Sequence, residues 1–108
     1  MIEAKNLNEF VKNIKRTKVV LVDFYADWCT PCKKLTPILE ELQNEFKDFS
    51  VVKVNVENDD VNEIVVDNNV SAMPTLMFYK NGQDINKNLI GLQTKETLKK
   101  VILELIED

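Results

Sequence analysis

The chain has 108 residues, of which 44% are hydrophobic and 30% charged, so we expect a single domain spanning residues 1–108. Its net charge of −4 at neutral pH argues against nucleic acid or an anionic membrane as a partner, because both attract basic surfaces. The absence of histidine excludes Ser-His and Cys-His catalysis, imidazole metal ligation and histidine pH switching.

The first half of the chain alternates between helical and strand patterns. Apolar residues spaced three and four apart predict a helix over residues 7–14, with Asn6 as its N-terminal cap. Residues 19–26 form an almost continuous apolar run, which is typical of a strand buried on both faces of a sheet. A second helical stripe follows over residues 35–46, and we expect Pro37 to kink that helix.

The second half begins with a strand, a short helix and a hairpin. Residues 51–56 indicate the strand and residues 61–65 the short helix. The apolar run 75–79 indicates a further strand. It is followed by an Asn-Gly dipeptide at residues 81–82, which is a strong hairpin signal, so the segment up to Ile90 should return antiparallel.

The order of these elements indicates the fold class. The last pattern is an amphipathic helix over residues 98–105, and a short strand near Ile2 is weakly signalled. Helices and strands therefore alternate until two consecutive strands precede the last helix. This order predicts an α/β protein with a central mixed sheet flanked by helices on both faces.

The only two cysteines lie three residues apart, between the buried strand and the second helix. They are too close in sequence to close a long loop, so a stabilising disulfide framework is not expected. A helix N-terminus stabilises a thiolate, and we expect Cys29 to lie exposed there, where it can attack a disulfide. Cys32, about one turn further along, is close enough to bond to Cys29 and to displace a mixed disulfide.

Two other interpretations of the cysteine pair remain open at this point. Both residues could be free structural thiols. Two thiolates without histidine cannot complete a tetrahedral zinc site, but two chains could share an ion or a cluster through both pairs. We favour thiol–disulfide exchange because the start of a helix is where a thiolate is stabilised.

Asp23 is the one charged residue in an otherwise apolar strand. A carboxylate that is desolvated in such a strand has a raised pKa and could accept the proton of Cys32. The alternative is a residue at the end of the strand that faces water.

The chain resembles the thioredoxin family over nearly its whole length. The resemblance rests on the run Val-Asp-Phe-Tyr-Ala-Asp-Trp-Cys-Thr-Pro-Cys-Lys at residues 22–33, on Pro37, on Met-Pro-Thr at 73–75, on Lys-Asn-Gly at 80–82 and on Gly91. It implies the thioredoxin fold and a cis peptide bond before Pro74.

The resemblance also implies roles for individual residues. Cys29 corresponds to the attacking nucleophile and Cys32 to the resolving thiol, while Asp23 corresponds to a buried carboxylate behind that thiol. Lys53 corresponds to a lysine near this aspartate, although by spacing alone it is an exposed strand residue. Thr30 stands where glycine is usual, so we expect it to affect the redox potential. The residues expected to contact substrate proteins are Trp28, Thr30, Pro31, Met73, Pro74, Ile90 and Gly91.

We expect a thiol–disulfide oxidoreductase that reduces the disulfides of substrate proteins. We also expect a monomer. We expect it in the cytoplasm, since the sequence shows neither a signal peptide nor a membrane span. It has no Gly-rich phosphate loop, so we expect no bound cofactor. The resemblance implies that electrons from NADPH arrive through a thioredoxin reductase. The alternatives are a dedicated redox donor or disulfide isomerase for one pathway, and a redox-independent binding subunit with the same fold.

Overall fold

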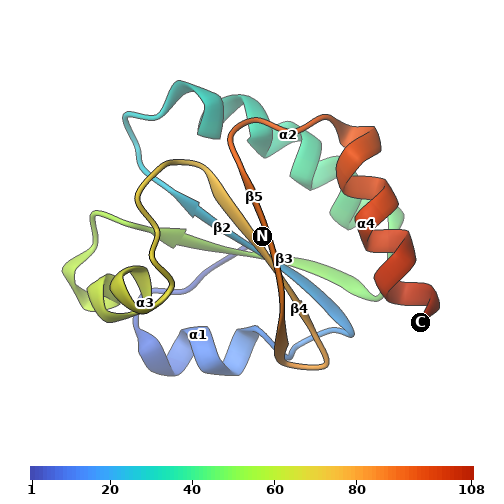
Figure 1. Cartoon of the computed structure of the whole chain (residues 1–108), viewed down its shortest axis with the longest axis horizontal. Coiled ribbons are helices and arrows are strands. Elements are labelled where there is room, and N and C mark those ends of the chain that lie inside the picture. The colour runs from blue at the N-terminus through green and yellow to red at the C-terminus, as the bar shows by residue number, and fades with distance from the viewer.

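The computed structural model describes residues 1–108. The elements in chain order are β1 (Ile2–Glu3), α1 (Leu7–Asn13), β2 (Val19–Tyr25), α2 (Thr30–Glu45), β3 (Phe49–Asn55), the 3₁₀ helix η1 (Asp59–Val61), α3 (Asn62–Asp67), β4 (Thr75–Lys80), β5 (Gln83–Ile90) and α4 (Lys95–Glu107). The five strands form one mixed sheet in the order β1-β3-β2-β4-β5. Helices α2 and α4 cover one face, and α1 and α3 cover the other (Figure 1). The predicted α/β class is confirmed.

Strand β2 lies at the centre of the sheet, parallel to β3 on one side and antiparallel to β4 on the other. Every residue of β2 is buried except Tyr25, which is half-buried, as the apolar run predicts. Because side chains alternate along a strand, Leu21 and Asp23 point to the face covered by α2 and α4, while Val22 points to the other. The single charge of the strand therefore lies on the α2 face.

Each face of the sheet carries its own hydrophobic core. The core under α2 and α4 consists of Val19, Leu21, Leu35, Leu39, Leu42, Phe49, Val51, Leu76, Phe78, Leu98, Val101 and Ile102. The core under α1 and α3 consists of Ala4, Phe10, Val20, Val22, Phe24, Val52, Val54, Val61, Ile64, Met77 and Tyr79. The first core anchors α2 on the sheet and so fixes the position of the residues at its N-terminus.

Helix α1 is less buried than its apolar pattern predicts. Asn6 caps the helix as expected, because its side chain accepts a hydrogen bond from the Glu9 amide at 2.9 Å. Phe10 is the buried residue of α1, whereas Leu7 and Val11 are exposed. The predicted stripe therefore does not pack as a whole against the sheet: Phe10 is buried, and Ile14, just beyond the helix, lies against the same core.

A tight turn connects β4 to β5, as the Asn-Gly dipeptide predicts. Asn81 and Gly82 have φ angles of 52° and 81°, and a two-residue hairpin turn of this kind requires positive values at both positions. A Cβ atom on Gly82 would lie 3.1 Å from the Cβ of Lys15, so little room remains there for a side chain. The turn returns β5 antiparallel as far as Ile90, which pairs with Thr75.

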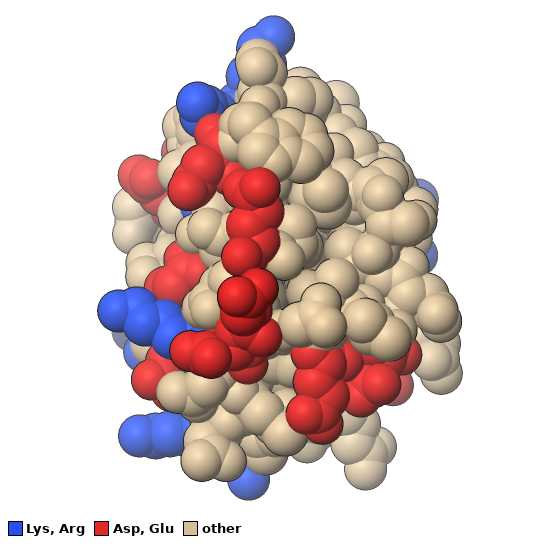
Figure 2. Space-filling view, turned by 90° about the vertical axis from the view of Figure 1, so that its left-hand side faces the viewer, with Lys and Arg blue, Asp and Glu red and all other residues tan.

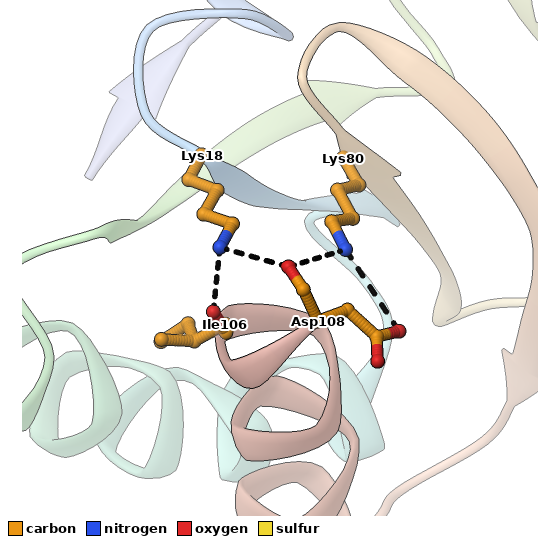
Figure 3. A network of polar contacts seen from close by, with 4 residues as sticks. All are labelled: Lys18, Lys80, Ile106 and Asp108. Carbon is orange, nitrogen blue, oxygen red and sulfur yellow. Dashed lines mark hydrogen bonds and ion pairs between the residues drawn. The ribbon is translucent and has the colours of Figure 1, made fainter.

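Two lysines fix the C-terminal end of α4 to the sheet (Figure 3). The Lys18 ammonium donates hydrogen bonds to the carbonyl oxygens of Ile106 at 2.6 Å and Asp108 at 3.2 Å. The Lys80 ammonium donates to the same Asp108 carbonyl at 3.2 Å and lies 3.8 Å from the Asp108 carboxylate. Cations in this position pair with free carbonyls at the helix end and with the negative end of the helix dipole. The contacts hold α4 against the residue before β2 and the last residue of β4.

Ion pairs connect the other end of α4 to the C-terminal half of α2. Lys95 pairs with Glu41 and Glu45, and the Lys99 ammonium lies 3.3 Å from the Glu45 carboxylate. These groups are at the surface, where each pair adds little to stability. None of the helices has the length and apolar character that crossing a membrane requires.

Candidate functional site

The two cysteines form a disulfide at the N-terminus of α2, with their Cα atoms 5.3 Å apart. Strand β2 ends at Tyr25, and a turn closed by a hydrogen bond from the Cys29 amide to the Ala26 carbonyl at 3.1 Å leads into the helix. Cys29 is the N-cap of α2, and its Sγ accepts a hydrogen bond from the Cys32 amide at 3.2 Å. Pro31 fits the first turn because an amide there has no helical partner. The predicted placement of the pair at a helix start is confirmed.

The disulfide is buried, and the expectation that Cys29 lies exposed is wrong for this state of the protein. Both cysteines are 3% exposed. They pack with Ala26 in a small apolar cluster, and Val56 and Met73 lie against it. We expected exposure from the position at the helix start alone. Met73, in the segment before β4, packs against the cysteine pair.

Asp23 lies on the sheet face that α2 covers and has no exposure to solvent. Neither of its carboxylate oxygens has a hydrogen-bond partner in the protein. Burial raises the pKa of Asp23 from 3.8 to about 7, the Lys53 ammonium opposes this rise, and the Glu3 carboxylate adds to it. The alternative of a strand-end residue that faces water is therefore excluded, and this carboxyl group can exchange a proton near neutral pH.

Lys53 is the neighbour of Asp23 on β3, because the two residues are in register across the parallel strands. Its ammonium lies 3.5 Å from the Thr36 hydroxyl and 4.4 Å from the centre of the Tyr25 ring. The side chain is half-buried, so the interpretation from spacing alone, an exposed strand residue, is wrong. The position beside Asp23 agrees with the family resemblance.

A pocket of about 160 Å³ lies between the first turns of α2 and the carboxyl ends of β2 and β3. A space of this size admits a few water molecules, which can carry protons between solvent and the site. Both Cys32 and Lys53 line it, so the second cysteine of the pair is reached through the same pocket as the lysine. The lining residues are Tyr25, Ala26, Asp27, Cys32, Lys33, Thr36 and Lys53.

An apolar surface lies next to the disulfide. Trp28 and Ile90 are each 64% exposed, so Trp28 is not a core residue. Pro31 and Thr30 are also exposed, Met73 and Gly91 are half-buried, and Pro74 is buried and follows a cis peptide bond. We refer to Trp28, Pro31, Met73, Pro74, Ile90 and Gly91 as the apolar rim.

The backbone of the apolar rim has free hydrogen-bonding groups. The Pro74 carbonyl accepts a hydrogen bond from the Gly91 amide at 2.8 Å, which ties the start of β4 to the residue after β5. The amide and the carbonyl of Met73 make no backbone hydrogen bond within the protein. An extended segment of another protein can therefore pair with Met73 without displacing a bond of this chain.

Exposed carboxylates gather on the side of the molecule formed by α3 and the segment before it (Figure 2). They include Glu57, Asp59, Asp60, Glu63 and Asp67. No group of three or more Cys, Asp or Glu side chains is placed to hold a metal ion. This surface repels anionic partners, in agreement with the net charge of −4.

Sequence reasoning missed three residues around Lys53. The Tyr25 hydroxyl donates a hydrogen bond to the Glu3 carboxylate at 2.6 Å, and the Thr36 hydroxyl donates to the Cys32 carbonyl at 3.3 Å. Burial, and then the hydrogen bond to Glu3, raise the pKa of Tyr25, so its hydroxyl keeps its proton. The weakly predicted strand near Ile2 was the only signal for Glu3.

The chain is similar to known thioredoxins in both sequence and structure. The family model described as Thioredoxin matches residues 1–104. A thioredoxin of Chlamydia caviae is 38% identical over 102 residues, which cover 94% of this chain and 93% of that protein. Thioredoxin-1 of Saccharomyces cerevisiae is 40% identical over 85 residues, which cover 79% and 81%.

Solved structures of thioredoxins superpose closely on this one. A mutant thioredoxin from Halobacterium salinarum has a TM-score of 0.88 at 31% identity, covering 96% of this chain and 88% of the other. The oxidised mitochondrial thioredoxin 3 of Saccharomyces cerevisiae has a TM-score of 0.84 at 36% identity, covering 96% and 94%. The similarity therefore extends over nearly the whole chain in each case.

Proposed function

Because this chain belongs to the thioredoxin family and is a thiol–disulfide oxidoreductase, we propose that it reduces protein disulfides with Cys29 as nucleophile and Cys32 as resolving thiol. The observation that carries this proposal is the disulfide between these two residues at the N-terminus of α2, next to the apolar rim. The reaction needs two thiols, a proton acceptor and a surface that receives the substrate, and each has a candidate in the site.

In the first step the Cys29 thiolate of the reduced protein attacks one sulfur of a substrate disulfide. The substrate S–S bond breaks, one substrate sulfur leaves as a thiolate, and the other is joined to Cys29 in a mixed disulfide. Cys29 suits this role because it caps α2 and its Sγ accepts a hydrogen bond from the Cys32 amide at 3.2 Å. A helix N-terminus and an amide donor both favour a thiolate over a thiol.

In the second step Cys32 attacks the Cys29 sulfur of the mixed disulfide. The new S–S bond joins the two cysteines, the second substrate sulfur leaves as a thiolate, and two electrons have passed to the substrate. We assign the proton that Cys32 loses to the Asp23 carboxylate. With a pKa of about 7, Asp23 is partly ionised near neutral pH and can accept a proton there.

The apolar rim is the proposed contact surface for substrate proteins. Trp28 and Ile90 offer exposed apolar area beside the disulfide. The free backbone groups of Met73 can add an extended substrate segment by strand-like pairing. We propose that the substrate is held by its backbone and apolar side chains, which suits a protein that reduces disulfides in many sequence contexts.

A separate protein must return the two electrons after each cycle. We propose a thioredoxin reductase that uses NADPH, because the chain has no phosphate-binding Gly-rich loop. We further propose that the chain is a single domain that works as a monomer in the cytoplasm, where thiols are kept reduced. Analytical ultracentrifugation of the reduced and oxidised protein tests the monomer.

The reduction of insulin disulfides, driven by NADPH and a thioredoxin reductase, tests the proposed function. We expect Cys29→Ser and the Cys29→Ser/Cys32→Ser double variant to have no turnover. Cys32→Ser should have none either, but it should accumulate a mixed disulfide with the substrate that Cys29→Ser cannot form. Turnover by the double variant, or equal trapping by both single variants, would contradict the assignment.

We propose that Thr30 shifts the redox potential of this site away from the value that is usual in the family. It is exposed at the first position of α2, next to the nucleophile. We expect Thr30→Gly to change the dithiol–disulfide equilibrium with glutathione, where a tenfold change corresponds to about 30 mV. An unchanged equilibrium constant would show that Thr30 does not set the potential.

A further inference from the structure

The Glu3 carboxylate has a place in the structure that the reaction described above does not use. Glu3 on β1 is in register with Lys53 on β3, and Lys53 is in register with Asp23 on β2. Residues in register on neighbouring strands point to the same face of a sheet, here the face that α2 covers. Three charged side chains therefore form one row across three strands, with the cation in the middle.

Tyr25 connects the two ends of this row. It lies on β2, two residues beyond Asp23 and on the same face, and its hydroxyl reaches across β3 to the Glu3 carboxylate at 2.6 Å. The Lys53 ammonium lies 4.4 Å from the centre of the Tyr25 ring, within the range of a cation–π contact. It makes no hydrogen bond to Asp23, whose two oxygens have no partner. The Lys53 ammonium thus contacts the Thr36 hydroxyl and the Tyr25 ring and forms no hydrogen bond with the buried carboxylate.

We propose that Glu3 is a positioning residue for the proton transfer assigned to Asp23: it holds the Tyr25 ring against Lys53 and offsets the charge of that ammonium. The inference rests on the proposed role of Asp23 as the proton acceptor of Cys32. A lysine whose charge acted on Asp23 without opposition would make the carboxylate a weaker base. The electrostatic effects have the required signs, since Glu3 raises the pKa of Asp23 and Lys53 lowers it.

Glu3 and Lys53 are the charged neighbours of Asp23 within the sheet. Leu76 on β4, which is in register with Asp23, carries no charge. The start of α2 and the loop before it contribute Asp27, Cys32 and Lys33 to the adjoining pocket. Asp27 and Lys33 are exposed, so solvent screens their charges more than that of half-buried Glu3.

The test is an NMR titration of the Asp23 carboxyl carbon in the oxidised protein. Glu3→Gln keeps an acceptor for Tyr25 but removes the charge, so it should lower the pKa of Asp23 by a few tenths of a pH unit or more. Tyr25→Phe keeps the charge but releases the Glu3 side chain, and we expect a smaller shift in the same direction. The double variant should lower the pKa at least as far as Glu3→Gln alone, because it removes both the charge and the hydrogen bond that holds the Tyr25 ring against Lys53.

Glu40→Gln is the matched control, since Glu40 is exposed on α2 and has no place in the row or its contacts. It should leave the pKa of Asp23 unchanged. A shift in Glu3→Gln no larger than in this control, or a shift upward, would overturn the proposal. The pH profile for resolution of mixed disulfides should move to lower pH together with the pKa.

The proposed function fails by a different result. If Asp23→Asn resolves mixed disulfides as fast as the parent, Asp23 is not the proton acceptor, whatever its pKa in the Glu3 variant. If Asp23→Asn is slow but Glu3→Gln leaves both the pKa of Asp23 and the pH profile unchanged, Asp23 keeps its role and Glu3 loses the one proposed here.

Discussion

The sheet face beneath α2 is built in two different ways along its length. Toward the start of β2, Leu21 packs with Leu39 and Leu42 of α2 in a fully buried apolar core. Toward the end of β2, the same face carries Asp23 with Lys53 beside it, and the neighbouring Tyr25 and Thr36 side chains form hydrogen bonds with Glu3 and Lys53. One helix thus covers an apolar half that stabilises the fold and a polar half to which we assign the proton transfer.

The difference shows how the fold keeps an unpartnered carboxyl group in its interior. A buried carboxylate without hydrogen bonds is unfavourable when it is ionised, and a raised pKa is the result. Such groups persist where they serve a function and where neighbouring structure supplies the stability. Here that structure is the apolar half, on the same strand and under the same helix.

The largest expected change in stability is the loss caused by Leu39→Ala in the apolar half. Leu39 is fully buried, so the substitution leaves a cavity and should lower the free energy of unfolding by about 2–5 kcal/mol. The pKa of Asp23 should stay near its parent value of about 7. Urea unfolding measures the first and NMR titration the second. Val66→Ala, at a residue that is 62% exposed, is the control and should change little.

If Leu39→Ala shifted the pKa of Asp23 clearly more than the control Val66→Ala does, the two halves of the face would form one cooperative unit rather than two.

The next effect, Asp23→Asn, should stabilise the oxidised protein in a pH-dependent way. The folded pKa of about 7 exceeds the unfolded value, so stability falls as pH rises from about 4 to about 7. Removing the ionisable group should therefore raise the free energy of unfolding at pH 8, by about 4 kcal/mol at most, and much less at pH 4. Urea unfolding at both pH values measures this difference.

Asp48→Asn provides the control for that measurement, because Asp48 is exposed in the loop between α2 and β3. It should give nearly the same stability change at both pH values. An Asp23→Asn variant with no more stability than the parent at pH 8 would falsify the buried, unpartnered state of the carboxylate.

The smallest effect is expected for Thr36→Val, at the boundary between the two halves. The Thr36 hydroxyl donates to the Cys32 carbonyl at 3.3 Å and lies 3.5 Å from the Lys53 ammonium, so both contacts are long. Their loss should cost at most about 1 kcal/mol of unfolding free energy. If Thr36→Val lowered the free energy of unfolding as much as Leu39→Ala does under the same conditions, the polar half would contribute to stability as the apolar half does.

The apolar half was the easier one to predict from sequence. The run over residues 19–26 and the Asn-Gly turn are local signals, and they gave the central strand and the hairpin. Asp23 was found as a charge in an apolar strand, and its burial and raised pKa are confirmed. The cis peptide bond before Pro74 came from the family resemblance alone, because local pattern does not show the isomer.

The polar half is built from contacts between segments that are distant in sequence. The spacing of apolar residues along the chain gives no information about such contacts. The burial of Cys29 was missed because the segment before β4 supplies Met73 to cover it. The row through Lys53 was missed because it depends on the register between β1 and β3. A strand of two residues has too little pattern to fix its register in advance.

Because the chain has no histidine, the buried Asp23 carboxyl group affects how the whole molecule buffers protons. Histidine is the only side chain whose unperturbed pKa lies in the range from pH 5 to 8, and this chain has none. With a pKa of about 7, Asp23 has the midpoint of its titration inside that range when the cysteines are oxidised. The potentiometric titration of the parent minus that of Asp23→Asn should therefore record about one proton per molecule, because the difference removes the α-amino group and the upper ends of the titration curves of the other carboxyl groups. The protonation of a single interior residue thus becomes measurable as bulk buffering capacity, without any label.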